Sequence, residues 1–491
     1  MTSFTPTEEQ LRIISAVSET RDNLIIEARA GAAKTTTLIM LAEAMPDARI
    51  LSLAFNAKIR DEMRERMPAN VDAMTLNGIG YSAWRGYCNT RCRVEKRKNY
   101  YLLRAEIEKL ERAEQKEAWE LFSETLKAIG KTKLMGYIGP NQSAGTRPLI
   151  SRADFYASAL DFEATPLQEQ LIDTVASKSW TATLRGELDF DDMLLGPAIC
   201  GVSFEHYDVV LVDEAQDLST INHVLLQKIC RFRTRLIAVG DPYQAIYGFR
   251  GADENSMAVL REAFAAKTFY LTVSFRCPQA IVENARWRAP DMQWPDWAKP
   301  GLILRPNMWS PSDIPDGAAI ICRNNAPLFT TAIRLLRAGR FPEFAGRDVL
   351  KNLVTRMRKL GKDKLPREKA LAAIKPWLEE EKKRQRNHDL LRDIAECMRI
   401  FLNETETLGD AIAFVKNLES RGGRIYLMTG HRAKGLEFDT VFFLDHHLCR
   451  KTGQDPNIRY VIETRAQNRL VYIKSDDFIK DKKGEPRENV A

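Results

Sequence analysis

The sequence predicts an α/β protein with two parallel sheets, each interrupted by a mainly helical insertion. Short, continuous apolar runs are separated by helical stretches, which is typical of parallel strands buried on both faces. The runs fall into two groups, one before about residue 277 and one after it. They are Leu24–Ala28, Ile50–Ala54, Val209–Val212, Leu236–Val239, Ala318–Cys322, Ile425–Met428, Val441–Leu444 and Leu470–Ile473.

Changes in composition along the chain predict the domain boundaries. We expect a first sheet domain from residues 1–86 and 186–277 and a second from 278–345 and 420–491. The insertions would be residues 87–185 and the shorter 346–419, both helical and rich in charge. The first carries the basic run Arg91–Lys98, which we expect to touch nucleic acid or to form a solvated helix face.

Composition limits the class of protein. With 491 residues, 44% of them apolar, the chain has room for several cores, and its net charge of +7 permits a polyanionic partner. Cys88 and Cys92 could share a helix face, but two ligands make no zinc or iron–sulfur site, so we expect reduced thiols. Without a signal peptide or a long apolar run, we expect a soluble, cytoplasmic protein and no membrane partner.

The segment Leu24–Leu38 predicts a nucleotide site. It reads as a buried strand, a turn of small residues from Ala30 to Ala33, and a helix that opens at Lys34-Thr35. In such a phosphate loop, backbone N–H groups and the helix N-terminus face the phosphates. Lys34 would reach the β- and γ-phosphates, and Thr35 would hold Mg²⁺. Ala33 stands where such loops usually carry glycine, which we expect to keep the backbone out of positive φ.

A second buried run ends in the acids that such a site needs. Val209–Val212 is followed by Asp213-Glu214-Ala215-Gln216-Asp217. Asp213 can bind Mg²⁺ through water, and Glu214 can accept a proton from the attacking water as general base. Together with the phosphate loop, these carboxylates predict an NTPase.

The motifs, in this order, resemble those of the UvrD/Rep family of superfamily 1 DNA helicases. The segment from Phe4 to Gln10 is similar to the family's glutamine motif, and the stretch from Val239 to Ala252 to its third motif. The resemblance implies that Gln10 reads the adenine and that Gln244 senses the γ-phosphate. It also implies DNA contacts by residues of the third motif, which are Tyr247, Phe249 and Arg250.

The second half of the chain supplies three further motifs of the same family. Leu271–Cys277 resembles the fourth, which implies that Phe275 stacks on adenine and that Arg276 touches the γ-phosphate. Thr429–Asp439 resembles the fifth, and Val461–Ala466 the sixth. These imply a ribose contact by Glu437, contacts of Thr429 and His431 with the DNA backbone, and Arg465 as an arginine finger.

What the resemblance implies is an ATP-dependent helicase with two RecA-like domains, moving 3′ to 5′ on single-stranded DNA. ATP and Mg²⁺ would sit in the cleft between the domains, and single strands, strand junctions and proteins of repair or replication would be its partners. The ATP contacts would be Gln10, Ala30, Gly31, Ala32, Ala33, Lys34, Thr35, Thr36, Phe275, Arg276, Glu437 and Arg465. Further DNA contacts would be Phe55, Asn56 and Thr75, although Phe55 could equally be a core residue at the end of its strand. We expect Trp287, Trp294 and Trp297 to pack on the second sheet rather than to contact DNA.

Two other functions fit the same residues. The first is a DNA-stimulated translocase that barely unwinds duplex, because the second insertion is shorter than the family's usual one. The second is a nucleotide-gated DNA-binding module with weak turnover, an alternative that Ala33 keeps open. The motifs alone fit an RNA track as well as a DNA track.

Overall fold

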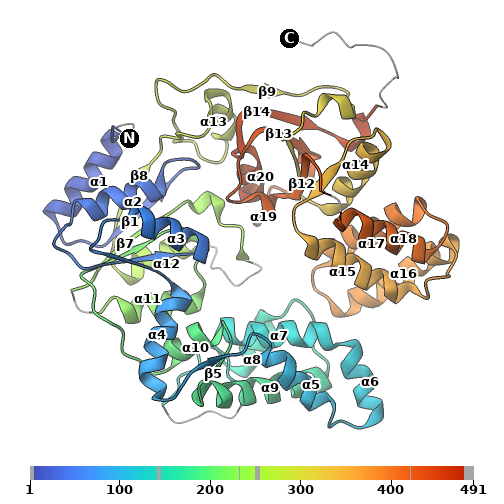
Figure 1. Ribbon diagram of the computed structural model, residues 1–491, viewed down its shortest axis with the longest axis horizontal. Coiled ribbons are helices and arrows are strands. Elements are labelled where there is room, and N and C mark those ends of the chain that lie inside the picture. The colour runs from blue at the N-terminus through green and yellow to red at the C-terminus, as the bar shows by residue number, and fades with distance from the viewer. Residues whose placement is uncertain (1–4, 141–144, 232, 249–254, 421, 480–491) are drawn as a thin grey trace. The chain divides into compact units, whose positions relative to one another are not determined.

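The computed structural model describes residues 5–140, 145–231, 233–248, 255–420 and 422–479, and the chain divides into two compact units. The first unit comprises residues 1–28 and 33–271, and it holds a six-stranded parallel sheet (Figure 1). The strand order is β3 (Val71–Thr75), β2 (Ile50–Ala54), β6 (Val209–Val212), β7 (Arg235–Gly240), β1 (Leu24–Ala28) and β8 (Lys267–Leu271).

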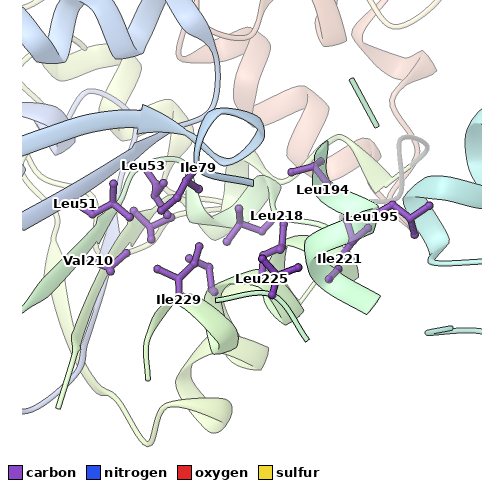
Figure 2. Packing of buried hydrophobic residues seen from close by; sticks show 14 of the residues in the cluster. Leu51, Leu53, Ile79, Leu194, Leu195, Val210, Leu218, Ile221, Leu225 and Ile229 are labelled. Atoms are coloured by element: carbon purple, nitrogen blue, oxygen red, sulfur yellow. The ribbon is translucent and has the colours of Figure 1, made fainter. Parts of the chain in front are cut away.

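Helices cover this sheet, and one apolar core lies against it. Figure 2 shows Leu51, Leu53 and Val210 of the strands facing Leu225 and Ile229 of a helix. Burying one such side chain contributes about 1.5 to 3 kcal/mol, so this core holds the sheet in place. The helices of the sheet region are α1 (Glu8–Glu19), α2 (Lys34–Glu43), α3 (Ala57–Arg66), α4 (Leu76–Cys88), α10 (Asp192–Ile199), α11 (Thr220–Ile229) and α12 (Ser256–Ala263).

The insertion in the first unit has a core of its own. Leu103, Ile129, Phe155 and Ile172 pack together within it, and Figure 1 places its helices at the far end of α4 from the sheet. Its elements are β4 (Arg93–Val94), α5 (Lys98–Ile107), α6 (Arg112–Glu120), α7 (Phe122–Met135), α8 (Arg152–Asp154), a π-helical turn (Phe155–Ala159), α9 (Pro166–Leu184) and β5 (Glu187–Leu188).

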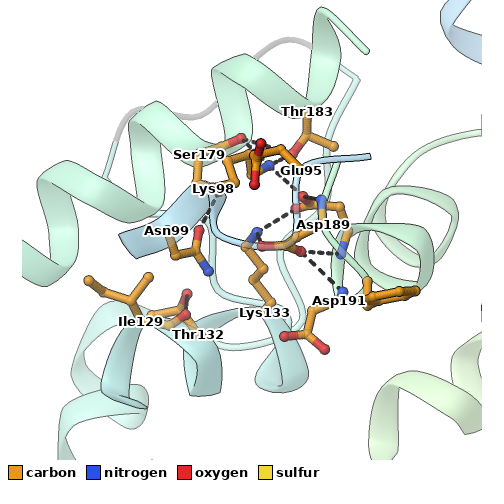
Figure 3. Close-up of polar contacts among 12 residues, drawn as sticks. Glu95, Lys98, Asn99, Ile129, Thr132, Lys133, Ser179, Thr183, Asp189 and Asp191 are labelled. Carbon is orange, nitrogen blue, oxygen red and sulfur yellow. Dashed lines mark hydrogen bonds and ion pairs between the residues drawn. The ribbon is translucent and has the colours of Figure 1, made fainter. Parts of the chain in front are cut away.

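A buried cluster of charges ties this insertion to α10 (Figure 3). Lys133 pairs with Asp189 at 2.6 Å and with Asp192 at 2.8 Å, while Lys98 also donates to Asp192. Burial lowers the pKa of Lys98 to about 8. Burial opposes ionisation of Asp192 as well, but the charges of Lys133 and Lys98 lower its pKa to about 2. The charges thus compensate one another in the interior.

The second unit comprises residues 29–32 and 272–491 and holds another six-stranded parallel sheet. The order is β11 (Pro342–Phe344), β12 (Ile425–Thr429), β10 (Ala319–Cys322), β13 (Phe438–Leu444), β14 (Ala466–Ile473) and β9 (Leu302–Leu304). Its helices are α13 (Gln279–Ala285), α14 (Asn325–Arg337), α19 (Gly430–Ala433) and α20 (Asp455–Glu463).

Four further helices form the insertion of the second unit. They are α15 (Arg347–Met357), α16 (Arg367–Arg384), α17 (His388–Asn403) and α18 (Leu408–Ser420). Their core includes Leu353, Ile374, Met398 and Val415, and Phe329 of α14 packs into it. This insertion is therefore a small helical domain anchored on one helix of the sheet region.

The predicted α/β class with two RecA-like parallel sheets is confirmed. All eight predicted strands are present. In the two six-stranded sheets, the four strands that the apolar runs did not reveal are β3, β8, β9 and β11, and each lies at an edge of its sheet. The short pair β4 and β5 was not predicted either. No helix within the described ranges is long and apolar enough to span a membrane.

Two predictions about the first insertion are wrong. Cys88 and Cys92 share no helix face, because α4 ends at Cys88 where Asn89 adopts a left-handed conformation with φ 47°. Their sulfur atoms nevertheless lie 3.3 Å apart, and both thiols are free. The basic run Arg91–Lys98 is no solvated helix face either: it passes through β4, and its last lysine is buried in the charge cluster.

The charge cluster predicts a large effect of Asp192→Asn. Removing one member of a buried charge network leaves the other charges uncompensated, so we expect a loss of about 3 to 5 kcal/mol in the free energy of unfolding. Because the folded-state pKa of Asp192 lies below the usual 3.8, this stability is present above about pH 4 and is lost as the pH falls toward 2.

Urea unfolding at neutral pH checks this prediction, with Glu108→Gln as the matched control. Glu108 pairs with Arg104 on the surface of α5, and both side chains are about half exposed. The control should change the free energy of unfolding by less than about 1 kcal/mol. Equal losses in the two variants would contradict the role given to the cluster.

Candidate functional site

The carboxyl ends of β1, β6 and β7 bring the predicted nucleotide residues of the first unit together. Parallel strands end at one edge of their sheet, and β7 lies between β6 and β1. Lys34 follows β1 and its Nζ lies 3.0 Å from Oε1 of Glu214, which follows β6. Beside this pair, the Thr35 hydroxyl donates to Oδ2 of Asp213 at 2.9 Å. The lysine and both acids therefore form one site.

A chain of hydrogen bonds continues from this ion pair to the third motif. Nε2 of Gln216 donates to Glu214, and Oε1 of Gln216 accepts from the Asp241 N–H at 2.9 Å. Oδ2 of Asp241 in turn accepts from Nε2 of Gln244 at 2.7 Å. Gln244 is thus connected to Glu214 and, through it, to Lys34.

Sequence reasoning gave no role to Gln216 or Asp241. Both lie inside recognised motifs, yet only the fold reveals that one amide joins the ends of β6 and β7. Gln216 and Asp241 are almost completely buried, so their hydrogen bonds are shielded from water. They hold the neighbouring Glu214 and Gln244 in fixed positions.

Charge is concentrated at this site. Burial, and next the charge of Glu214, raise the pKa of the Asp213 carboxyl to about 6. Burial acts to lower the pKa of Lys34, but the charges of Glu214, Asp213 and Asp241 outweigh it, and that pKa is raised. The buried acids thus form a region where a cation is favoured.

These residues fit a magnesium ion. Asp213 and Thr35 offer a carboxylate and a hydroxyl, which are the oxygen ligands that Mg²⁺ prefers. In the described part of the chain, no group of three or more His, Cys, Asp or Glu residues could hold a metal. A two-residue site matches Mg²⁺, which keeps several water ligands and binds substrate phosphates.

The first half of the phosphate loop groups with the second unit. The Arg29 guanidinium makes two bonds to Asp291, at 2.7 and 2.6 Å. The Ala30 N–H donates to the Tyr460 hydroxyl at 3.0 Å. At Gly31, with φ 77°, an added Cβ would lie 2.6 Å from the nearest side-chain atom, so only glycine fits. The loop conformation is therefore set by tertiary contacts.

Ala33 adopts the left-handed conformation, with φ 56° and ψ 40°. The expectation that an alanine would keep this position out of positive φ is therefore wrong. Such a conformation costs a residue with a Cβ roughly 1 to 2 kcal/mol. Helix α2 begins immediately after it, and the first intrahelical bond runs from the Thr37 N–H to the Ala33 carbonyl. The N–H groups of Lys34, Thr35 and Thr36 precede that bond and can receive phosphate oxygens.

Gln10 lies at the start of α1 and is fully buried. Its Oε1 accepts from the Thr7 N–H at 2.9 Å, and its Nε2 donates to the Thr37 hydroxyl of α2 at 2.9 Å. The amide thus caps α1 and connects it to the helix of the phosphate loop. Recognition of adenine by Gln10 stays a prediction, and it would have to use the second hydrogen of this amide.

In the second unit, two arginines lie beside one carboxylate. Arg276 pairs with Glu437 at 2.5 Å. The buried Arg465 donates to the carbonyl oxygens of Val461 and Leu436. Burial, and next the charge of Arg276, lower the pKa of Arg465 to about 10. The Nε atom of Arg276 is buried and has no hydrogen-bond partner among the described residues. Excess positive charge and an unsatisfied donor are what an anion such as phosphate would stabilise.

The structure corrects one expectation about the tryptophans. Trp297 and Trp287 do not pack on the second sheet, since 69% and 44% of their surfaces are exposed. Trp294 lies under the Arg286 guanidinium, 4.7 Å from it. Phe275 is half-buried, and its ring lies beside that of Trp297.

The predicted DNA contacts of the first unit lie along the same edge of its sheet, beyond the acids. Phe55 follows β2 and is 45% exposed, so it is no core residue. Its ring is parallel to that of Tyr247, with an angle of 5° and centroids 6.3 Å apart. Asn56 and Thr75 cap the N-termini of α3 and α4. Two further predicted contacts, Phe249 and Arg250, lie outside the described residues.

The predicted contacts of the second unit lie at two edges of its sheet. Thr429 ends β12 and His431 lies in α19, so both are at the carboxyl edge. Glu437 and Arg465 immediately precede β13 and β14, which places them at the amino edge. The residues predicted to contact DNA and nucleotide are therefore separated.

Two family models match the chain. The UvrD/REP helicase N-terminal domain matches residues 7–265, and the UvrD-like helicase C-terminal domain matches residues 345–477. The first match alone covers more than half of the chain and includes the acids and the phosphate loop. The second includes Thr429, Glu437 and Arg465.

Several curated proteins are similar to the chain. F-box DNA helicase protein 1 of Schizosaccharomyces pombe is 24% identical over 95% of this chain and 57% of that protein. DNA helicase II of Escherichia coli is 23% identical over 58% of this chain and 41% of its own length. A probable DNA helicase II homolog of Mycoplasma genitalium is 24% identical over 53% and 40%. The chain thus spans less than two thirds of the length of these relatives.

The conformation of Ala33 predicts that Ala33→Gly stabilises the protein. Glycine adopts positive φ without the steric cost of a Cβ, so we expect the free energy of unfolding to rise by about 1 kcal/mol. Ala32 is the matched control, because it is buried in the same loop and its φ is not positive.

Urea unfolding of the two variants measures the difference. Ala32→Gly should lower the free energy of unfolding by about 1 kcal/mol, since glycine gains freedom in the unfolded chain. A loss of stability in Ala33→Gly of the same size as in the control would mean that Ala33 is not strained in solution.

Proposed function

The chain belongs to the UvrD/REP helicase family, and on this premise we propose that it is an ATP-dependent DNA helicase. It would hydrolyse ATP with Mg²⁺, move 3′ to 5′ along single-stranded DNA and open duplex at strand junctions. The direction follows from the family motifs alone. The relatives named DNA helicases are longer than this chain, so their activity comes to it as part of this proposal.

The hydrogen-bonded series from Lys34 to Gln244 carries the proposal. It connects Lys34 and Glu214 with Gln244, and we assign to Glu214 the role of general base and to Gln244 that of γ-phosphate sensor. Lys34 would bind the β- and γ-phosphates, and Glu214 would accept the proton of the attacking water. Asp213 would hold the metal ion, which neutralises charge on the phosphates when bound.

The arginines of the second unit would complete this chemistry. Phosphoryl transfer spreads negative charge over the γ-phosphate oxygens, and a guanidinium placed there speeds hydrolysis by about 10³ to 10⁵. We assign that role to Arg276 and Arg465, so that a single ATP engages residues of both units. ATP binding would then favour contact of the nucleotide with both units, and hydrolysis would release it. This alternation is the basis of stepping along the strand.

The DNA end of the first sheet supports a single-stranded track. Parallel, partly exposed rings at Phe55 and Tyr247 suit stacking on bases, worth about 1 to 3 kcal/mol per base and tolerant of sequence. Tyr247 lies three residues after Gln244, so a change at Gln244 would reach the proposed DNA contact through a short segment of the chain. Proteins of DNA repair or replication stay the proposed partners, on the family resemblance alone.

A second candidate is a DNA-stimulated translocase with little unwinding. It is favoured by the small insertion of four helices in the second unit, α15 to α18. Strand displacement would be weak in that case, although single-stranded DNA would still stimulate hydrolysis.

Phosphate release and strand displacement by the purified protein test the proposal. We expect single-stranded DNA to stimulate phosphate release at least tenfold, and unwinding of duplex with a 3′ overhang but not with a 5′ overhang. Glu214→Gln should lower hydrolysis by about 10² or more because the general base is lost, with ATP binding retained. Stimulation without displacement would favour the translocase. If single-stranded DNA does not stimulate hydrolysis by the wild type, and the wild type hydrolyses ATP no faster than Glu214→Gln, the protein is instead a nucleotide-gated DNA-binding module.

Gln216→Ala tests the connection between Glu214 and the third motif. Loss of two hydrogen bonds, one to a charged group, should lower DNA-stimulated kcat by about 10- to 100-fold, with a smaller change in the KM for ATP. Gln227→Ala, at an exposed position on α11, is the control and should hydrolyse ATP like the wild type. An unchanged kcat in Gln216→Ala would show that this amide does not position Glu214.

A further inference from the structure

Trp297 is an exposed aromatic residue beside a ring that sequence analysis assigned to adenine. With 69% of its surface exposed, it is the most exposed large apolar side chain among the described residues. Its ring centroid lies 6.1 Å from that of Phe275, and the planes are inclined by 29°. Because most of its indole is exposed to water, Trp297 contributes little burial energy to the fold, so packing does not explain its position.

Both rings are held on fixed backbone of the second unit. The Phe275 N–H donates to the Gly31 carbonyl of the phosphate loop at 2.9 Å. Trp297 lies in a turn closed by a hydrogen bond from the Ala298 N–H to the Pro295 carbonyl at 2.9 Å. Nε2 of Gln279, the first residue of α13, donates to the Ala298 carbonyl at 2.9 Å. The turn is thus fastened to a helix while the indole stays accessible.

We propose that Trp297 and Phe275 form the two faces of a clamp for the adenine base of ATP, an inference that rests on the proposed function. Aromatic planes stack about 3.5 Å apart, so a base between two rings needs a spacing of about 7 Å. The two ring centroids are 6.1 Å apart and their planes are inclined, so the rings are closer together than a bound base requires. Movement of the indole away from Phe275, with rotation into parallel alignment, opens the clamp to one base.

The position of Trp297 in the fold favours a nucleotide base over a DNA base. Its turn precedes β9, which pairs with β14, which in turn pairs with β13. Trp297 therefore lies at the amino edge of this sheet, where Arg465 and Glu437 precede β14 and β13. Thr429, predicted to contact DNA, ends β12 at the opposite edge.

The groups at and next to Phe275 are those assigned to the base, the phosphates and the ribose of one nucleotide. The ring is the base contact, and its own backbone N–H binds the phosphate loop at Gly31. The next residue, Arg276, pairs with Glu437, the predicted ribose contact. A second stacking surface on Trp297 adds discrimination by ring size, because a purine offers more area to two aromatic faces than a pyrimidine does.

Nucleotide binding by Trp297 variants tests the clamp. Dissociation constants are measured by calorimetry for ADP, CDP and inorganic tripolyphosphate, which has phosphates but no base. Trp297→Ala should weaken ADP about tenfold, reduce the preference for ADP over CDP, and leave tripolyphosphate unchanged. Trp297→Phe keeps a ring and should restore most of the affinity. Trp287→Ala is the control: this indole is also partly exposed, but it lies under the Arg459 guanidinium and should bind ADP like the wild type.

The outcomes separate the clamp from the proposed helicase. Weaker ADP binding in Trp297→Ala supports the clamp even if the wild type neither hydrolyses ATP nor unwinds DNA. Unchanged ADP binding overturns the clamp while DNA-stimulated hydrolysis in the wild type would still support the helicase. An equal loss for ADP and tripolyphosphate overturns it too, as does a loss confined to binding of single-stranded oligonucleotide, which would make Trp297 a DNA contact.

Discussion

The structure depends on one constraint: all strands of each sheet are parallel and therefore end at a common edge. In the first unit this edge gathers residues that are far apart in the chain, since Lys34, Asp213 and Asp241 follow β1, β6 and β7. A parallel sheet also has to be covered on both faces, which explains why its inner strands are mostly apolar and almost completely buried. The polar side chains that could do chemistry are consequently limited to the strand ends and the loops after them.

The charges of the two units complement each other. Around Lys34 the first unit gathers three acids, and burial raises the pKa of one of them, Asp213. Around Glu437 the second unit gathers Arg276 and Arg465, whose positive charges oppose each other. The first group therefore favours a metal cation, and the second favours an anion.

Backbone strain is located at the same place. Ala33 and Glu214 are both non-glycine residues in the left-handed region: Ala33 directly precedes Lys34, and Glu214 is the ion-pair partner of Lys34. Strained conformations persist only where surrounding contacts impose them, and they concentrate at functional sites. At Glu214, one such contact is the hydrogen bond that its side chain accepts from Gln216.

By itself the sequence determined the fold class, the eight inner strands and the residue types of the site, because continuous apolar runs and motif spacing are local properties. It did not reveal β3, β8, β9 and β11, since edge strands are buried less completely and their apolar runs are short or interrupted by polar residues. Tertiary structure decided the conformation of Ala33, the link through Gln216 and the place of Trp297. Each of these depends on contacts between segments distant in the chain, and no local pattern encodes such contacts.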